Sequence, residues 1–333
     1  MRPKEYRIKE LLREKGLDGA IVSSPENFHY VTGFGGHQHT VSRQPGFTLA
    51  VMRADDKVPT HLTTMDFEAA TFRIKAAGLN FVVDPYDTWV GLKTWDEIAH
   101  GAVVPDKTAM ESSMDKLVQF MKACDLANKK VGIELDYLPV PYYKSLTEKF
   151  PEAEFVNISD LFVYARSVKQ PDEIEMFRKL CRIADHGFTE VSKIAKIGVS
   201  ERELVQCFRE DVIKSGFCAP SSWSMFSTGP SSARLTLPGD GVVKDGDVVK
   251  FDAGVNAEFD FYTTDTSRAW IIGNGDPALL KLKDRLYEGQ RRMIAAAKPG
   301  LPINELYHTA YDYVKEMFPC YRRGHQGHSI SMG

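Results

Sequence analysis

The sequence lacks the features that mark membrane, secreted and nucleic-acid-binding proteins. No apolar stretch approaches the ~20 residues that a membrane-spanning helix needs, and the segment after Met1 carries no apolar run typical of a signal peptide. The formal net charge is only -3, and no long run of one sign occurs. Neither a membrane nor a nucleic acid is therefore expected as a partner.

Cysteine is scarce, and its spacing excludes the common cysteine motifs. The five cysteines are scattered, without a Cys-x-x-Cys pair. An odd, scattered set is typical of reduced structural thiols, so the sequence predicts a cytoplasmic protein. Internal repeats and low-complexity segments are absent as well, which excludes solenoid architectures.

What is present is an ordinary globular composition, with 43% hydrophobic and 26% charged residues over 333 positions. This length predicts two domains. Helical and strand patterns alternate through about residue 160, as in an α/β domain. We therefore expect an α/β domain over residues 1–160 and a second domain over 161–333, giving the class α+β overall. Helices are expected over 6–15, 68–78, 114–128, 170–197, 201–215, 276–297 and 303–318, and strands over 17–23, 47–52, 58–63, 131–134, 154–157, 221–226, 248–253 and 264–272.

The stretch from Lys250 to Arg268 carries the strongest chemical signal. It joins two predicted strands, and a hairpin between them would place Asp252 and Asp265 side by side. Neighbouring carboxylates repel unless a proton or a cation lies between them, and hard divalent cations favour carboxylate and imidazole ligands. A metal or catalytic pair is one interpretation. A turn at Asp252 and a helix cap or Asx turn at Asp265 is the other.

Two histidine pairs supply further candidates. His325 and His328 lie on a glycine-flanked turn near the end of the chain, where imidazoles can bind metal or shuttle protons. His37 and His39 lie in a predicted glycine-containing loop. Their spacing could suit a metal, but without further ligands we favour substrate gating, a subunit contact or no role.

Several motifs in this order resemble the creatinase/aminopeptidase P/prolidase family, whose catalytic domain has the "pita-bread" fold. The resemblance covers nearly the whole chain and places a creatinase-like N-terminal domain before the catalytic domain. The motifs are Gly16-Leu-Asp-Gly-Ala-Ile-Val22, Pro25-Glu-Asn-Phe-His-Tyr-Val-Thr-Gly33, Arg166-Ser-Val-Lys-Gln-Pro-Asp-Glu-Ile-Glu175, Gly246-Asp-Val-Val-Lys-Phe-Asp-Ala-Gly254, Tyr262-Thr-Thr-Asp-Thr-Ser-Arg268 and Gly327-His-Ser-Ile-Ser331.

The resemblance implies a metal-dependent Xaa-Pro aminopeptidase or dipeptidase that cleaves a peptide bond with activated water. Two divalent ions, manganese, cobalt or zinc, are implied, with Asp252, Asp265 and His328 as ligands. A small peptide substrate and a homodimer are implied too. On this interpretation the candidate catalytic residues are His328, His325 and Arg268, and the candidate substrate-binding residues are Tyr262, His37, His39 and Arg234.

The chain departs from the family pattern in ways that keep two alternatives open. The family's two glutamate ligands would follow the histidine motif but are missing, so a chain truncated at its C-terminal end and an incomplete catalytic domain are expected. The aspartates are thirteen positions apart instead of eleven, and residues 230–237 hold no histidine where peptidases carry a proton shuttle. The alternatives are a creatinase-like hydrolase of a small C–N compound and a catalytically inactive binding module.

Overall fold

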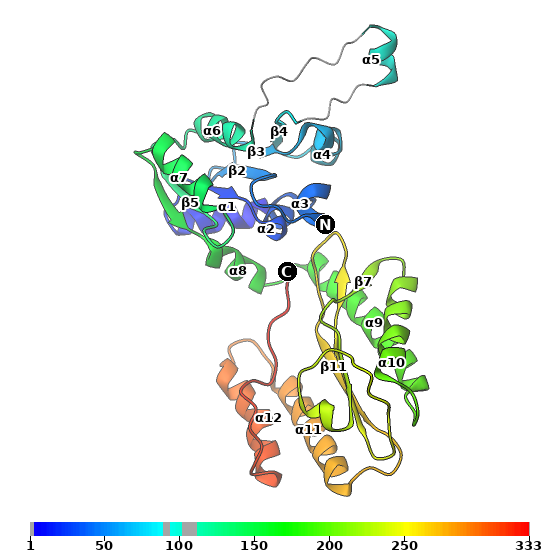
Figure 1. Ribbon diagram of the computed structural model, residues 1–333. Coiled ribbons are helices and arrows are strands. Elements are labelled where there is room, and N and C mark those ends of the chain that lie inside the picture. The colour runs from blue at the N-terminus through cyan, green and yellow to red at the C-terminus, as the bar shows by residue number, and fades with distance from the viewer. Residues whose placement is uncertain (1–2, 89–93, 102–111, 333) are drawn as a thin grey trace. The chain divides into compact units, whose positions relative to one another are not determined.

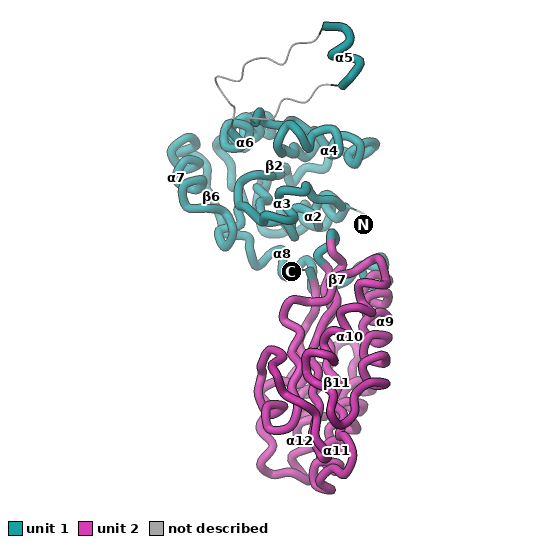
Figure 2. Tube along the Cα trace, turned by 45° about the vertical axis from the view of Figure 1, so that its right-hand side comes forward, with its two compact units in different colours: residues 1–174, 259–261, 332–333 teal, residues 175–258, 262–331 magenta. Residues whose placement is uncertain are grey.

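The computed structural model describes residues 3–88, 94–101 and 112–332, and the chain divides into two compact units (Figure 2). Unit 1 comprises residues 1–174, 259–261 and 332–333, and unit 2 comprises residues 175–258 and 262–331. In the part of the chain that is described, no helix combines the length and the apolarity needed to cross a bilayer.

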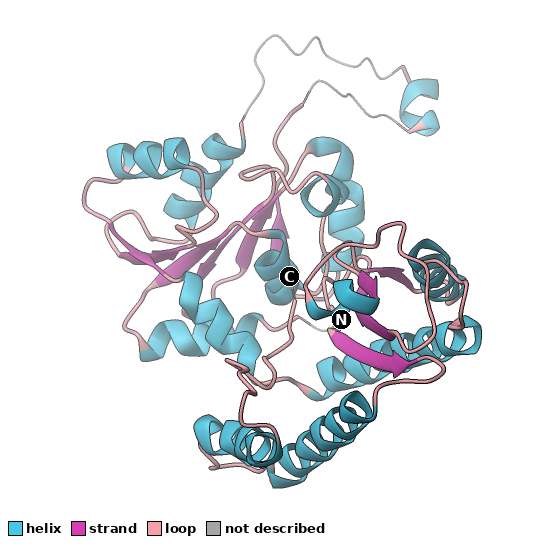
Figure 3. Cartoon of the chain, turned by 60° about the horizontal axis from the view of Figure 1, so that its bottom comes forward, coloured by secondary structure: helices cyan, strands magenta, loops and turns pink. Residues whose placement is uncertain are grey.

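A six-stranded mixed sheet forms the centre of unit 1, with the order β4-β3-β2-β1-β5-β6 (Figure 3). The central strand β1 pairs antiparallel with β2 and parallel with β5. All four residues of β1 are buried, so both faces of the sheet are covered. The strands are β1 Gly19–Val22, β2 Leu49–Arg53, β3 Thr60–Thr63, β4 Phe81–Val83, β5 Lys130–Ile133 and β6 Glu154–Asn157.

The helices of unit 1 bury the apolar faces that their sequence patterns predict. Helix α1 turns Ile8 and Leu12 inward, and α6 packs Leu117 and Phe120 into the same core cluster as Val51 of the sheet. These helices are α1 Glu5–Glu14, α2 Pro25–Thr32, α3 His37–Val41, α4 Ala69–Ala76, α5 Trp95–Ala99, α6 Ser113–Ala123, α7 Val140–Lys149 and α8 Ser159–Ser167, with a 3₁₀ turn, η1 Asp66–Glu68.

Unit 2 is built around a three-stranded antiparallel sheet with the order β11-β9-β8 (Figure 1). A separate two-stranded ribbon pairs β10 with β7, and α11 and α12 pack on each other through Gly289 and Val314. The elements in chain order are α9 Pro171–Ile194, α10 Glu201–Lys214, β7 Cys218–Pro220, β8 Met225–Thr228, η2 Gly229–Ala233, β9 Val248–Ala253, β10 Val255–Ala257, β11 Thr266–Ile271, α11 Pro277–Ala296 and α12 Ile303–Met317.

Aromatic packing fixes the central strand β9 of unit 2. Phe251 is fully buried, and its ring centroid lies 4.8 Å from that of Phe188 on α9 and 4.7 Å from that of Phe208 on α10. Edge-to-face aromatic pairs of this kind stabilise a core beyond their buried area. The inward face of β9 is therefore anchored, and its outward face is held in a defined orientation.

Most predicted elements are confirmed to within a few residues, and two are wrong. The strand predicted over 221–226 begins only at Met225, as β8; residues 221–224 form a turn between β7 and β8, in which the Ser224 hydroxyl donates to the Ser221 carbonyl oxygen. The loop predicted around His37 and His39 is the short helix α3. The predicted hairpin is confirmed as the antiparallel pair β9–β11. The short strand β10 lies between them in the sequence and pairs with β7 instead.

Candidate active site

Strand β9 places Asp252 on the half-buried face of the sheet, opposite the face that enters the core. Alternate residues of the strand are buried, among them Phe251 and Ala253, while Lys250 and Asp252 are half-buried on the opposite face. This alternation is the one that the sequence predicts. Across the sheet, Asp252 lies opposite Ser267 on β11 and opposite Met225 on β8.

A close backbone approach brings Asp265 to the same place. The N–H of Val255 donates to the Thr264 hydroxyl at 2.9 Å, and the N–H of Thr264 donates to the Val255 carbonyl oxygen at 3.0 Å. A side chain at Gly254 would collide with the carbonyl oxygen of Thr264. Glycine at this position therefore lets the chain before β11 cross close to the end of β9.

The two aspartate carboxyl groups contact each other. The pKa of Asp252 is raised, first by burial and then by the neighbouring charge of Asp265 and the hydrogen bond between the two side chains. Two carboxylates in contact cannot both stay ionised without a compensating proton or cation. The predicted juxtaposition of Asp252 and Asp265 is thus present.

His328, in the segment after α12, joins the two aspartates. Its Nε2 lies 2.9 Å from Oδ2 of Asp265, and its Nδ1–H donates to the carbonyl oxygen of Ser329 at 3.0 Å. The pKa of His328 is raised, first by that backbone hydrogen bond and then by Asp265 and Asp252. The contact to Ser329 fixes the ring so that Nε2, the nitrogen available to a ligand, faces the carboxylates.

The donor set fits a divalent cation by its chemistry. Asp252, Asp265 and His328 offer carboxylate oxygen and imidazole nitrogen, and a cation would relieve the repulsion between the two carboxylates. They touch pairwise through Asp265 and do not form a closed cage. Within residues 3–88, 94–101 and 112–332, no group of three or more histidine, cysteine, aspartate or glutamate side chains is arranged to hold a metal.

The other predicted residues of unit 2 lie in different surroundings. Arg268 forms an ion pair with Asp185, with its Nη2 2.7 Å from Oδ1 of Asp185, and both side chains are exposed. Tyr262 is buried, with its ring edge-on to Phe177. The ring centroid of His325 lies 6.4 Å from that of His328, and Arg234 follows η2, where its carbonyl oxygen accepts from Lys250.

His37 and His39 belong to unit 1 and differ from each other. His37 begins α3 and lines a surface pocket. His39 is buried, and its Nε2–H donates to the Ser23 carbonyl oxygen at 2.9 Å. Burial lowers the pKa of His39 to about 4, so the ring is neutral at physiological pH.

Sequence reasoning missed a buried carboxylate that organises the loop next to Asp252. Glu201 accepts hydrogen bonds from the N–H of Thr228 at 2.8 Å and from the N–H of Gly239 at 2.7 Å. It thereby holds both ends of residues 229–239, and Lys250 holds the middle through Arg234. The only available signal was an acid at the start of a helix, which ordinarily indicates a surface charge near the helix dipole.

Comparison with known proteins agrees with this architecture. Residues 6–168 match the creatinase/prolidase N-terminal domain, and residues 175–333 match metallopeptidase family M24. A Xaa-Pro dipeptidase of Pyrococcus furiosus is 29% identical over 319 residues, which are 95% of this chain and 78% of that protein. A Xaa-Pro dipeptidase of Lactobacillus delbrueckii subsp. lactis is 24% identical over 98% of this chain and 81% of its own length.

Solved structures show the same fold. A Xaa-Pro dipeptidase from Bacillus anthracis superposes with a TM-score of 0.78 at 22% identity, covering 98% of this chain and 81% of that one. The prolidase from Pyrococcus horikoshii OT3 superposes with a TM-score of 0.74 at 20% identity, covering 98% and 82%. The chain belongs to metallopeptidase family M24, a family of hydrolases, and carries the creatinase/prolidase type of N-terminal domain. The predicted α+β fold, with a creatinase-like domain before a pita-bread domain, is confirmed.

Proposed function

We propose that this chain is a metal-dependent hydrolase of Xaa-Pro dipeptides or of peptides with proline at the second position. The observation that carries the proposal is the contact of Asp265 with both Asp252 and His328. The names of the relatives, among them the Xaa-Pro dipeptidases of Pyrococcus furiosus and Lactobacillus delbrueckii, support the substrate class.

In this proposal, residues of unit 2 would hold the divalent metal and keep the site in a fixed arrangement. Asp252, Asp265 and His328 would hold divalent metal. When bound, such an ion lowers the pKa of water and polarises a scissile carbonyl. The backbone contact from His328 to Ser329 keeps the ring in place, and Glu201 keeps the neighbouring loop in place. Arg268, His325, Tyr262 and Arg234 remain proposed contributors from the sequence.

The finer properties are also proposals. We infer two ions per chain, of manganese, cobalt or zinc, from the resemblance to family peptidases. A cytoplasmic location is supported by the five cysteines, all of which are free thiols in the structure, and a homodimer is inferred from the resemblance to family peptidases.

The test is metal analysis combined with a dipeptide assay. The purified protein should contain stoichiometric manganese, cobalt or zinc, hydrolyse Leu-Pro faster than Leu-Ala, and lose activity on chelation. Asp265→Ala should lose both the metal and the activity. Asp240→Ala is the matched control, because Asp240 is highly exposed and pairs with Arg202 at the surface. A folded protein that binds no metal and cleaves neither peptide would refute the proposal.

A second candidate is a creatinase-like hydrolase of a small C–N compound. Residues 229–241, which lie between β8 and β9, contain no histidine, so a proton shuttle from this loop is missing. Turnover of creatine without turnover of Leu-Pro would favour this candidate. A folded protein that turns over neither compound would favour the inactive binding module.

A further inference from the structure

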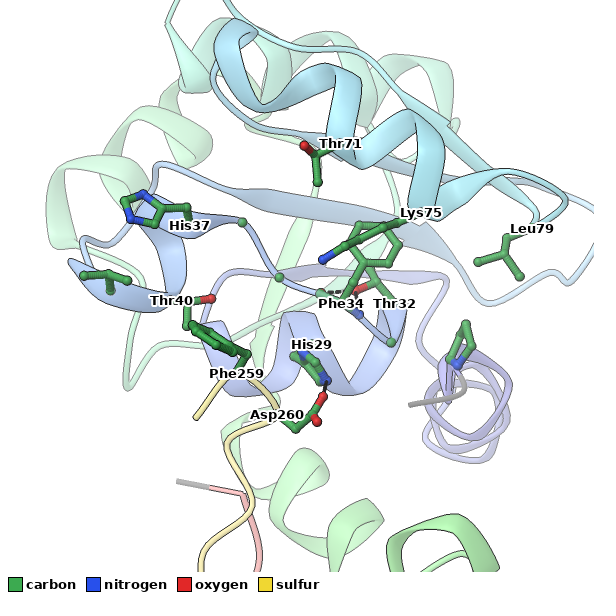
Figure 4. A pocket seen from close by; sticks show the side chains of 15 residues that line it. His29, Thr32, Phe34, His37, Thr40, Thr71, Lys75, Leu79, Phe259 and Asp260 are labelled. Carbon is green, nitrogen blue, oxygen red and sulfur yellow. Dashed lines mark hydrogen bonds and ion pairs between the residues drawn. The ribbon is translucent and has the colours of Figure 1, made fainter. Parts of the chain in front are cut away.

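A pocket of about 660 Å³ lies in unit 1 and has no assigned role (Figure 4). It is lined by the end of α2, the glycine-rich turn that follows, the start of α3, one side of α4 and residues 259–260, all of which belong to unit 1. Its volume falls within the range of about 300–1,000 Å³ that is typical of small-molecule sites.

The pocket presents one anionic and one cationic group. Asp260 lies at the pocket wall with its Oδ1 3.2 Å from Nε2 of His29, although the contact lacks the geometry of a directed hydrogen bond. The pKa of Asp260 is lowered, first by this His29 contact, so the carboxylate is ionised at neutral pH. On the other side stands Lys75, which is exposed and has no ion-pair partner among the described residues. In Figure 4 the Asp260 carboxylate points at the His29 ring, to which a dashed line joins it, and the Lys75 side chain extends towards the pocket from α4.

The floor of the pocket contains a histidine that is not satisfied by the protein. The His29 side chain is only 4% exposed, and its Nδ1 has no hydrogen-bond partner among the described residues. Burial lowers the pKa of His29, which favours the neutral ring. A buried polar atom without a partner costs free energy, so the protein tolerates a penalty at the base of this pocket.

Apolar side chains form the remaining wall. Phe34 is almost fully buried beneath the pocket, whereas Leu79 is 40% exposed and Phe259 is 66% exposed. Large apolar side chains that stay in water next to a cavity favour an occupant with an apolar body. The Nζ of Lys75 lies 5.9 Å from the centroid of the Phe34 ring, so the cation stands beside the apolar wall.

We propose that this pocket binds a small zwitterion, an amino acid with an apolar side chain. Its ammonium group would pair with Asp260, its carboxylate with Lys75, and its side chain would lie against Phe34, Leu79 and Phe259. The choice of ligand rests on the proposed function only in that amino acids are the products of dipeptide hydrolysis. The residues that line the pocket belong to unit 1, whereas Asp252, Asp265 and His328 belong to unit 2.

Calorimetric titration of the full chain with L-leucine tests the proposal. Binding with a dissociation constant of roughly millimolar order is expected for a ligand of this size. Two analogues each lack one charge: 3-methylbutylamine has no carboxylate, and 4-methylpentanoate has no ammonium. Each should bind about fivefold more weakly than leucine, as expected for the loss of one solvent-exposed ion pair.

Variants locate the site. Lys75→Met and Asp260→Asn should each weaken leucine binding about fivefold. Lys144→Met is the matched control, because Lys144 lies on α7, outside the pocket, and it should bind leucine as the parent does. Phe259→Ala provides a second test that leaves the charges intact, and it should also weaken binding.

The outcomes separate this inference from the proposed function. Leucine binding that persists in Asp265→Ala supports a pocket distinct from the metal site, even if the protein hydrolyses no dipeptide. Binding that is lost in Asp265→Ala, or that is unchanged in folded Lys75→Met and Asp260→Asn, would overturn the inference. So would equal affinity for leucine and 4-methylpentanoate, which would indicate a site for anions alone, and so would the absence of leucine binding.

Discussion

Oδ2 of Asp265 lies 2.9 Å from Nε2 of His328, although the two residues are 63 positions apart in the sequence. Asp265 directly precedes β11, while His328 lies in the segment after α12. The same aspartate also contacts Asp252, so it is the residue that joins the group. A divalent cation at this point would find oxygen and nitrogen donors already in contact.

The paired histidines near residue 328 give a matched comparison. His328→Asn should lower metal content and reduce kcat/KM by at least about a hundredfold, because even residues behind metal ligands typically contribute 10–100-fold. His325→Asn should leave metal content unchanged, since the contact with Asp265 is made by His328. Elemental analysis and dipeptide kinetics measure both effects. Equal metal loss in the two variants would contradict the assignment of His328 as the ligand.

Gly254 should tolerate no side chain. Gly254→Ala introduces a Cβ that collides with the Thr264 carbonyl oxygen and lies 2.9 Å from the Trp223 side chain. We expect a loss of about 1–3 kcal/mol in the free energy of unfolding, together with weaker metal binding. Gly239→Ala is the control, because its added Cβ would lie 3.5 Å from Glu201, an ordinary contact. Urea unfolding curves that coincide for the two variants would contradict the close approach seen at Gly254.

Glu201 should contribute far more than its neighbour Glu203. Glu201→Ala leaves the N–H groups of Thr228 and Gly239 without an acceptor, which we expect to cost about 3 kcal/mol. Glu203 is exposed and caps the same helix through Ser200, so Glu203→Ala should cost about 0.5 kcal/mol. Denaturant titration measures both losses. Limited proteolysis should cut the Glu201→Ala variant first within residues 229–239, and an uncut loop would argue against its anchoring role.

Acid should destabilise unit 1 through His39. Its pKa is about 4 in the folded protein and 6.5 when unperturbed, so between these values the unfolded chain binds the proton and the folded chain does not. The contribution, about 3 kcal/mol, is fully present above pH 6.5 and is lost as the pH falls towards 4. His39→Gln should flatten the dependence of unfolding free energy on pH in this window. His37→Gln, its partner on α3, should keep the parent slope, and an unaltered slope in His39→Gln would contradict the buried neutral ring.

Local sequence is enough to specify many of the helices and strands and the two faces of β9. Alternation in residues 248–253 puts Asp252 and the buried Phe251 on opposite faces of the strand, because successive side chains alternate and only one face could enter the core. Helices such as α10 are predictable from their caps and apolar periodicity, which are local signals. The motifs near Asp252, Asp265 and His328 likewise indicate the correct family from the order of their residues.

Long-range packing, by contrast, determines which distant groups meet. The segment over residues 221–226 has the pattern of a strand, but the hydrogen bond from Ser224 to Ser221 makes its first four residues a turn. A side chain that bonds to the backbone in this way does not alter the hydrophobic periodicity. The burial of His39 and the anchoring of residues 229–239 by Glu201 depend on long-range contacts. The local pattern of apolar and polar residues indicates which face of a segment is exposed to solvent. The partner of a buried polar group, by contrast, is determined by the packing of segments far apart in the chain.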